Sequence, residues 1–337
     1  MRAAVAALFL ASVVAAGVVG ANQDGGAEPR PARSAVVTTT TTAPTVSVPP
    51  GPPPTALPAA EPAPVPPEQA KVLVSPRGVV VPVEGHGAGG FRVHTPCGRT
   101  AVVRSGTPLG AADVVLDPGH GGDEAGATGP GGFTEKELNL AVATHAKQAL
   151  ARAGVTSVLT RTGDYRMTLG ARARVALALR PKAFVSIHHN AEPDGPRPGP
   201  GTETYRQLAS DDSKRLSGLV YEEVVNALSA YSVAWVADTD AGAKYRASSR
   251  GDDYYGILRR TKGVPAVLAE LAFISNRPEE ALLKRPDVQR VEGEAVARGI
   301  LRYLNTKDPG SGFVEPYPRD SPAGPGGDAS GCVDPGL

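Results

Sequence analysis

Cysteine is nearly absent from this chain of 337 residues, which contains only Cys97 and Cys332. Two cysteines exclude a disulfide-dense scaffold and a metal site built from four thiolates. An excess of one charge is also lacking, since 35 Lys and Arg residues stand against 34 Asp and Glu residues, a formal net charge of +1. This balance excludes a broad electrostatic interface for nucleic acid and argues against a polybasic membrane anchor. Because the chain has only two cysteines, any bound metal must use His and carboxylate ligands.

Large apolar side chains are scarce over residues 22–70 and 306–337, where glycine and proline are frequent. Residues 22–70 combine many prolines with a threonine run, so they cannot bury enough apolar surface to offset the entropy of ordering. We predict a disordered tether over residues 22–70 and a second disordered tail over residues 306–337.

The first 21 residues have a different composition. Met1 and Arg2 precede an apolar run over residues 3–20, and small residues lead to Ala21 before a polar continuation. This pattern is typical of a secretory signal peptide over residues 1–21. An uncleaved anchor is the alternative, because the run is close to the minimum length of a membrane span. We expect the protein outside the cytoplasm, with no membrane span once the signal is removed.

Two further regions have the pattern of folded structure. Over residues 71–111, β-branched runs alternate with Gly and Pro turns and predict three or four short strands. Because so short a segment seldom folds alone, we expect this β-element to pack on or near the next domain; a separate binding module is the alternative. Over residues 112–305, apolar strands alternate with amphipathic helices. This alternation indicates an α/β domain with a mostly parallel twisted sheet and helices on both faces.

The expected elements of the α/β domain follow from the same pattern. Strands are predicted at residues 114–116, 157–160, 183–187, 202–205 and 266–268. Helices are predicted at residues 135–153, 169–179 and 213–230, with two more between 278 and 304. In such sheets the ligand site lies beyond the carboxyl ends of the strands.

Residues that can bind a metal follow the first predicted strand of this domain. His120 lies in the turn Asp-Pro-Gly-His-Gly-Gly, where glycines let the backbone bend and a ligand approach. Glu135 follows Thr134, whose spacing to Glu137 fits a capping box and places Glu135 at the first helical position. There the helix dipole favours the ionised carboxylate that a metal requires. Taken singly, a loop histidine is usually solvated and a first-turn glutamate usually only complements the dipole.

Two other strands also end in such residues. The strand at 183–187 runs into His188, His189 and Asn190, and Glu270 ends the strand that begins at residue 266. Because side chains alternate along a strand, His188 and His189 point to opposite sides, and at most one of them can face a given metal. Periodicity alone leaves open which one. We expect these strand ends and Glu135 to meet along one edge of the sheet.

Five ordered segments resemble the zinc-dependent N-acetylmuramoyl-L-alanine amidases of the amidase-3 type. They are residues 117–122, 135–136, 159–161, 186–191 and 270–276. The resemblance covers about residues 112–305. It implies His120, Glu135 and His188 as the ligands of one zinc ion per chain, and Glu270 as the catalytic base.

The same resemblance implies a function. The implied protein is a secreted or cell-wall-associated autolysin that acts in cell wall turnover. It would use zinc-activated water to cleave the amide between the lactyl group of N-acetylmuramic acid and L-alanine of the stem peptide. Peptidoglycan or muropeptides would be its partner, and we expect a monomer. A zinc peptidase acting on another cell-wall amide and a catalytically silent wall-binding protein are the alternatives. The complete set of ligands and base argues against the silent binder, which needs no general base.

Substrate contacts and a disulfide complete the expectations. His189, Asn190 and Arg250 are candidates for substrate binding, although His189 also fits a half-exposed histidine without a role. Residues 192–201 form only a short Pro/Gly loop, so we predict no blocking helix there. In an oxidising compartment, Cys97 and Cys332 can form a disulfide that ties the tail to the β-element; free thiols are the alternative.

Overall fold

The computed structural model describes residues 60–316, 327 and 329–337. The predicted signal peptide and most of the predicted tether lie outside these residues. None of the helices in the described part of the chain is long and apolar enough to cross a membrane.

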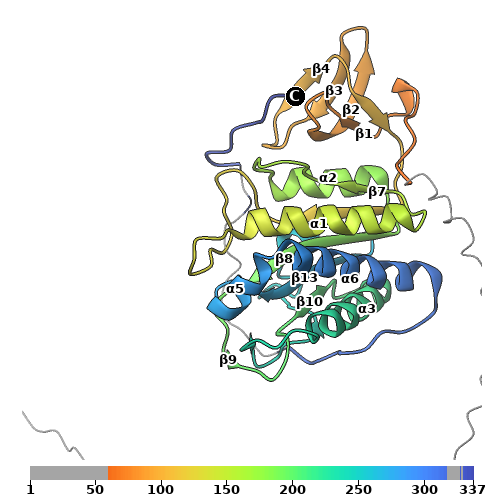
Figure 1. The fold of residues 1–337 in the computed structure, drawn as a ribbon. Coiled ribbons are helices and arrows are strands. Elements are labelled where there is room, and N and C mark those ends of the chain that lie inside the picture. The colour runs from red at the N-terminus through yellow and green to blue at the C-terminus, as the bar shows by residue number, and fades with distance from the viewer. Residues whose placement is uncertain (1–59, 317–326, 328) are drawn as a thin grey trace, which may run out of the picture. The chain divides into compact units, whose positions relative to one another are not determined.

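A mixed, mostly parallel sheet forms the centre of the α/β domain (Figure 1). Its strands in the described residues are, in spatial order, β12 (Ala243–Lys244), β10 (Glu203–Arg206), β13 (Ala266–Phe273), β8 (Ala183–Asn190), β6 (Val114–Pro118) and β7 (Ser157–Leu159). Strands β13, β8, β6 and β7 run parallel to one another, whereas β10 is antiparallel to β13 and parallel to β12. The predicted sheet is therefore confirmed, and its parallel strands end at one edge.

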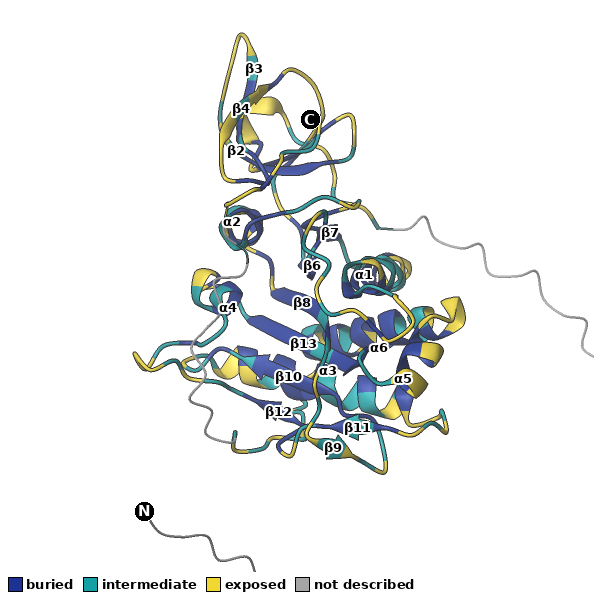
Figure 2. Cartoon of the chain, turned by 90° about the vertical axis from the view of Figure 1, so that its left-hand side faces the viewer, coloured by how far each residue is buried: buried dark blue, intermediate teal, exposed yellow. Residues whose placement is uncertain are grey.

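Helices cover both faces of this sheet, as predicted (Figure 2). One face carries α1 (Glu135–Arg152), α3 (Asp211–Leu228), α5 (Arg277–Leu283) and α6 (Pro286–Asn305), and the other carries α2 (Leu169–Leu179) and α4 (Gly256–Arg260). Alternation along β8 serves both cores. Val185 and Ile187 pack with the first group of helices, whereas Phe184 packs with the second.

The segment between β8 and β10 contains only β9 (Gly195–Pro196), which pairs with β11 (Val236–Ala237). All residues between these two long strands are described, and none of them is helical, as the loop length predicts. Neither two-residue strand was expected from the sequence.

The β-element has five strands rather than the predicted three or four. They are β1 (Val72–Val74), β2 (Val80–Gly87), β3 (Gly90–His94), β4 (Thr100–Val103) and β5 (Thr107–Leu109), preceded by the short 3-10 helix η1 (Pro67–Gln69). Val72, Val80 and Leu109 share a buried cluster with Met167 and Ala171 beside and within α2. The β-element thus packs on the α/β domain, which is the expectation that we preferred.

Both predicted disordered segments extend too far. At the N-terminal side, Pro64 pairs with Leu109, and the Ala60 amide donates a hydrogen bond to the Ala151 carbonyl. At the C-terminal side, Phe313 forms a bridge with Ala243, and residues 329–337 contact the β-element. Composition indicates disorder because it counts local apolar content, whereas these segments are ordered by long-range backbone pairing and a disulfide.

Candidate metal centre and active site

His120, Glu135 and His188 meet where β6 and β8 end and α1 begins. One potential ligand atom from each residue lies within 4.8 Å of the other two. Glu135 lies between the histidines, with its Oε2 3.2 Å from His120 Nε2 and its Oε1 2.9 Å from His188 Nδ1. The side chains that the sequence singles out therefore share one place in the fold.

The His120 turn is held by buried arginines and by a close approach of the chain. His120 adopts a left-handed backbone conformation with φ of 60°, and its carbonyl accepts a hydrogen bond of 2.7 Å from Arg172. Arg161 donates to the Gly119 carbonyl at 2.9 Å. A Cβ atom at Gly119 would lie 2.2 Å from His188 Cε1, so only glycine lets the turn pack against this ring.

Arg172 also forms a buried ion pair of 2.8 Å with Asp117 at the end of β6. Arg161 belongs to one of the motif segments, and Arg172 stands in a predicted helix, but sequence reasoning missed their common role as donors to the turn. The available signal was weak, since Arg161 follows a short apolar strand and Arg172 stands in a helix rich in Ala and Leu, where a buried charge needs partners.

Glu135 is the first residue of α1, as predicted, and the capping box between Thr134 and Glu137 is present. Its carboxylate also accepts hydrogen bonds from the Ala127 amide at 2.8 Å and from Asn139 Nδ2 at 3.1 Å. Burial opposes ionisation, but the bonds and charges of the two neighbouring histidines outweigh it and hold the pKa of Glu135 well below its ordinary value. The carboxylate is therefore kept in its charged form.

The two strand-end histidines occupy opposite faces of β8, as their alternation requires. His188 lines the cavity at the candidate centre, and burial lowers its pKa, which favours the neutral imidazole. His189 is 1% exposed and lies between Asn139, at 2.8 Å, and Glu292 of α6, at 3.3 Å. The expected substrate contact by His189 is therefore wrong, because its side chain is enclosed on the far face of the sheet.

Glu270 stands directly opposite His188 in the register of β13 and β8. Its Oε2 is buried and has no hydrogen-bond partner among the described residues. Burial, together with the negative charge of Glu135, raises the pKa of Glu270 well above its ordinary value. Glu270, His120 and His188 line one cavity of about 510 Å³.

A second group of carboxylates lies on the other side of Glu270. Glu203 and Asp240 are buried and Asp238 is half-buried, with carboxylate oxygens within 4.8 Å of one another. Lys244 Nζ lies 2.7 Å from both Glu203 Oε1 and Asp240 Oδ1, so this group already contains a cation. No motif in the sequence indicated it. Its internal ammonium makes it a weaker candidate for a metal than the His120 centre.

The other two candidate contacts lie apart from the cavity lining. Asn190 is half-buried, and its Nδ2 donates to Glu203 Oε2 at 3.1 Å. Arg250 is exposed in the loop after β12 and is not one of the residues around the cavity. The structure thus brings the three candidate ligands and Glu270 together but does not bring Arg250 to them.

Comparisons with known proteins show the family to which this chain is similar. Residues 114–302 match the family model described as N-acetylmuramoyl-L-alanine amidase (Amidase_3). The endolysin of Bacillus phage SPP1 is 35% identical over 214 residues, which are 62% of this chain and 72% of the endolysin. The amidase LytC of Bacillus subtilis (strain 168) is 31% identical over 213 residues, 62% of this chain and 39% of LytC.

Among solved structures, Cwp6 from Clostridium difficile superposes with a TM-score of 0.51 at 30% sequence identity. The match covers 58% of this chain and 30% of that one. The family match spans more than half of the chain and includes all three candidate ligands and Glu270. This chain therefore belongs to the N-acetylmuramoyl-L-alanine amidase family of peptidoglycan amide hydrolases.

Proposed function

We propose that this protein is a secreted, zinc-dependent amidase that cleaves the amide between the lactyl group of N-acetylmuramic acid and L-alanine of the stem peptide. One observation carries the proposal: the two histidines of the candidate centre line a cavity together with Glu270. Glu135 lies between these histidines, and the buried Oε2 of Glu270 has no hydrogen-bond partner within the described residues. A buried carboxylate oxygen without a partner is costly unless a ligand or substrate meets it.

The donor set fits zinc. Two imidazoles and one carboxylate leave the fourth position of a tetrahedral site open, which is typical of catalytic rather than structural zinc. The lowered pKa values of Glu135 and His188 keep both groups in the forms that bind a metal. Asn139 and the buried arginines fix the orientation of the ligands, as supporting hydrogen bonds do at metal sites. We propose His120, Glu135 and His188 as the ligands of one zinc ion.

Bound zinc supplies a Lewis acid that lowers the pKa of water and polarises the scissile carbonyl. The remaining steps belong to Glu270. Its raised pKa suits a group that takes a proton from the attacking water and returns it to the leaving amine. The products are a lactyl carboxylate on muramic acid and a free amino terminus on L-alanine.

Secretion is proposed on two grounds. The N-terminal sequence has the pattern of a signal peptide. The disulfide between Cys97 and Cys332 fits an oxidising compartment outside the cytoplasm. Peptidoglycan, the substrate of this enzyme family, is located in the same place.

Digestion of purified muropeptides by the full chain, with and without a chelator, tests this proposal. Mass spectrometry is expected to show two products whose masses sum to the substrate plus one water, with L-alanine at the new amino terminus. The chelator is expected to stop the reaction, and added zinc to restore it. Cleavage at a different amide would indicate a peptidase instead. Binding without cleavage by the zinc-loaded chain would indicate a silent wall-binding protein.

A further inference from the structure

The C-terminal segment reaches the cavity of the candidate active site. Gly327 lines this cavity together with Glu124, Met167 and Leu169. We propose that Gly327 and residues 329–337, called here the C-terminal wall, form one side of the substrate cavity and restrict the size of substrate that it accepts. This inference rests on the proposed amidase function.

The backbone amide and carbonyl of Gly327 each form a hydrogen bond with a residue that lines the cavity. Its amide donates to Glu124 Oε1 at 3.3 Å, and its carbonyl accepts from the Leu169 amide at 3.1 Å. Glu124 follows the His120 turn, whereas Leu169 is the first residue of α2. The backbone of Gly327 therefore bridges the two elements that border the cavity on this side.

Only glycine fits at this point. Gly327 has a φ of +78°, and a Cβ atom there would lie 2.4 Å from Leu169 Cγ. The left-handed conformation alone would strain another residue. The added Cβ would also clash with the side chain of Leu169, which lines the cavity. A substitution at Gly327 therefore has to move either the wall or Leu169.

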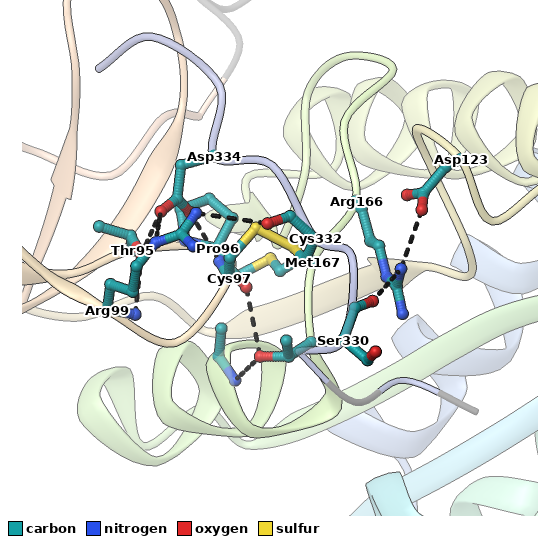
Figure 3. Close-up of a disulfide and its surroundings, with 12 residues drawn as sticks. Thr95, Pro96, Cys97, Arg99, Asp123, Arg166, Met167, Ser330, Cys332 and Asp334 are labelled. Carbon is teal, nitrogen blue, oxygen red and sulfur yellow. Dashed lines mark hydrogen bonds and ion pairs between the residues drawn. A yellow bond between two sulfur atoms is a disulfide. The ribbon is translucent and has the colours of Figure 1, made fainter. Parts of the chain in front are cut away.

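Arg166 joins the wall to the loop that follows His120. Its Nη1 donates to the Ser330 carbonyl at 2.9 Å and lies 2.9 Å from Asp123 Oδ2, as Figure 3 shows. Its Nη2 lies 3.0 Å from Glu124 Oε1. One guanidinium therefore contacts both the wall and two acidic residues near the candidate centre.

A disulfide and a carboxylate fasten the far part of the wall to the β-element (Figure 3). Cys332 is bonded to Cys97 across a separation of 235 residues. Asp334 accepts hydrogen bonds from the Cys97 amide at 2.8 Å, from Thr95 Oγ1 at 2.9 Å and from Arg99 Nε at 2.8 Å. The wall is thus anchored on a folded element rather than held by the cavity alone.

The part of the β-element that holds the disulfide is connected to the start of α2, which borders the cavity. The Thr168 amide, at the start of α2, donates to the Pro96 carbonyl at 2.9 Å. Met167, which lines the cavity, directly precedes Thr168, and Pro96 directly precedes the disulfide-bonded Cys97. The β-element therefore holds the disulfide that positions the wall.

The side of the cavity next to the wall is apolar, because Met167, Leu169 and Ile257 line it. An uncharged part of a single stem peptide fits such a surface. A second, cross-linked peptide would need the space that the wall fills. We therefore expect the enzyme to prefer uncross-linked muropeptides over cross-linked ones.

Two matched glycine substitutions in the full chain test this inference. Gly327→Ala introduces the clash with Leu169, whereas Gly331→Ala has the same left-handed strain, at φ +69°, with nothing within 4 Å of the added Cβ. We compare kcat/KM for an uncross-linked muropeptide and for its cross-linked dimer. Gly327→Ala is expected to raise the ratio of dimer to monomer cleavage about tenfold, mainly through a higher kcat/KM for the dimer, which the displaced wall no longer excludes. Gly331→Ala is expected to change the ratio by less than about twofold.

Hydrogen exchange provides a readout that does not depend on activity. The Leu169 amide donates to Gly327, so its exchange is expected to accelerate in Gly327→Ala and in the double variant C97S/C332S, but not in Gly331→Ala. Unchanged exchange in both of the first two variants would contradict the fastening of the wall.

The kinetic outcomes separate the two proposals. A zinc-loaded wild-type chain that cleaves neither muropeptide would refute the amidase function, and substrate selection by the wall with it. An active wild type whose ratio is unchanged by Gly327→Ala would refute the wall alone. Equal acceleration of both substrates by Gly327→Ala would mean that the segment blocks the site rather than shaping it, and would also overturn the inference.

Discussion

Glu135 is buried and Glu270 is half-buried with its Oε2 enclosed, yet the surroundings of these two carboxylates drive their pKa values apart. Glu135 accepts hydrogen bonds from two histidines and stays ionised, whereas Glu270 Oε2 has no partner in the described part of the chain and faces the negative charge of Glu135. Such a pair separates a ligand from an acid-base group. The roles that we propose for these two residues follow from this difference.

Replacement of Glu270 by glutamine removes the base but leaves the three proposed ligands in place. Turnover of muropeptides is expected to fall by about 10² to 10⁴-fold, the usual contribution of a general acid-base group. Zinc content, measured by metal analysis of the same preparation, is expected to stay near one per chain.

His120→Ala is the matched comparison, since it is expected to lower the zinc content itself. Near-normal turnover by the Glu270→Gln protein would contradict the role of the base. Full zinc content in the His120→Ala protein would contradict the role of the ligand.

His188 and His189 mark the limit of sequence reasoning at the residue scale. Alternation along a strand predicts that they face opposite sides, and the structure agrees. It does not predict that His189 is enclosed, because that depends on Glu292, which is 103 residues away in the sequence. The choice of His188 as the proposed ligand came from the family resemblance rather than from periodicity.

At the scale of elements, α2 supports the candidate centre through Arg172. This side chain is 3% exposed and pairs with Asp117, which is 1% exposed, while it also donates to the His120 carbonyl. Arg172→Met leaves the Asp117 charge buried without its partner, so the free energy of unfolding is expected to fall by about 3 to 5 kcal/mol.

Urea denaturation of the metal-free chain measures this change. The control is Arg285→Met, which breaks an ion pair with Asp287 whose side chains are 52% and 51% exposed. Such a solvent-exposed pair contributes little to stability, so this substitution is expected to leave the free energy of unfolding nearly unchanged. Equal effects of the two substitutions would show that the Arg172 pair does not stabilise the turn.

Elements with local signals could be predicted, and those that depend on distant partners could not. The capping box at Thr134 fixes the start of α1 in sequence and structure alike. The two-residue strands β9 and β11 have no pattern of their own and exist only by pairing with each other. The order of the C-terminal wall depends in the same way on Cys97, Glu124 and Arg166, which lie far from it in the sequence.

At the scale of the whole molecule, the fold places two clusters of potential ligands on either side of Glu270. One contains His120, Glu135 and His188, and the other contains Glu203, Asp238 and Asp240. Lys244 supplies the second cluster with a positive charge, so only the first lacks a cation of the chain's own within the described residues. The sequence indicated the first cluster through its motifs, whereas the second arises from strands and loops without a shared pattern.

The position of the metal tests the central claim most directly. Crystals of the zinc-loaded chain, measured at the zinc absorption edge, are expected to give one anomalous peak. It is expected about 2.0 to 2.2 Å from an imidazole nitrogen of His120, a carboxylate oxygen of Glu135 and an imidazole nitrogen of His188. A peak among Glu203, Asp238 and Asp240, with none at the His120 centre, would contradict the account.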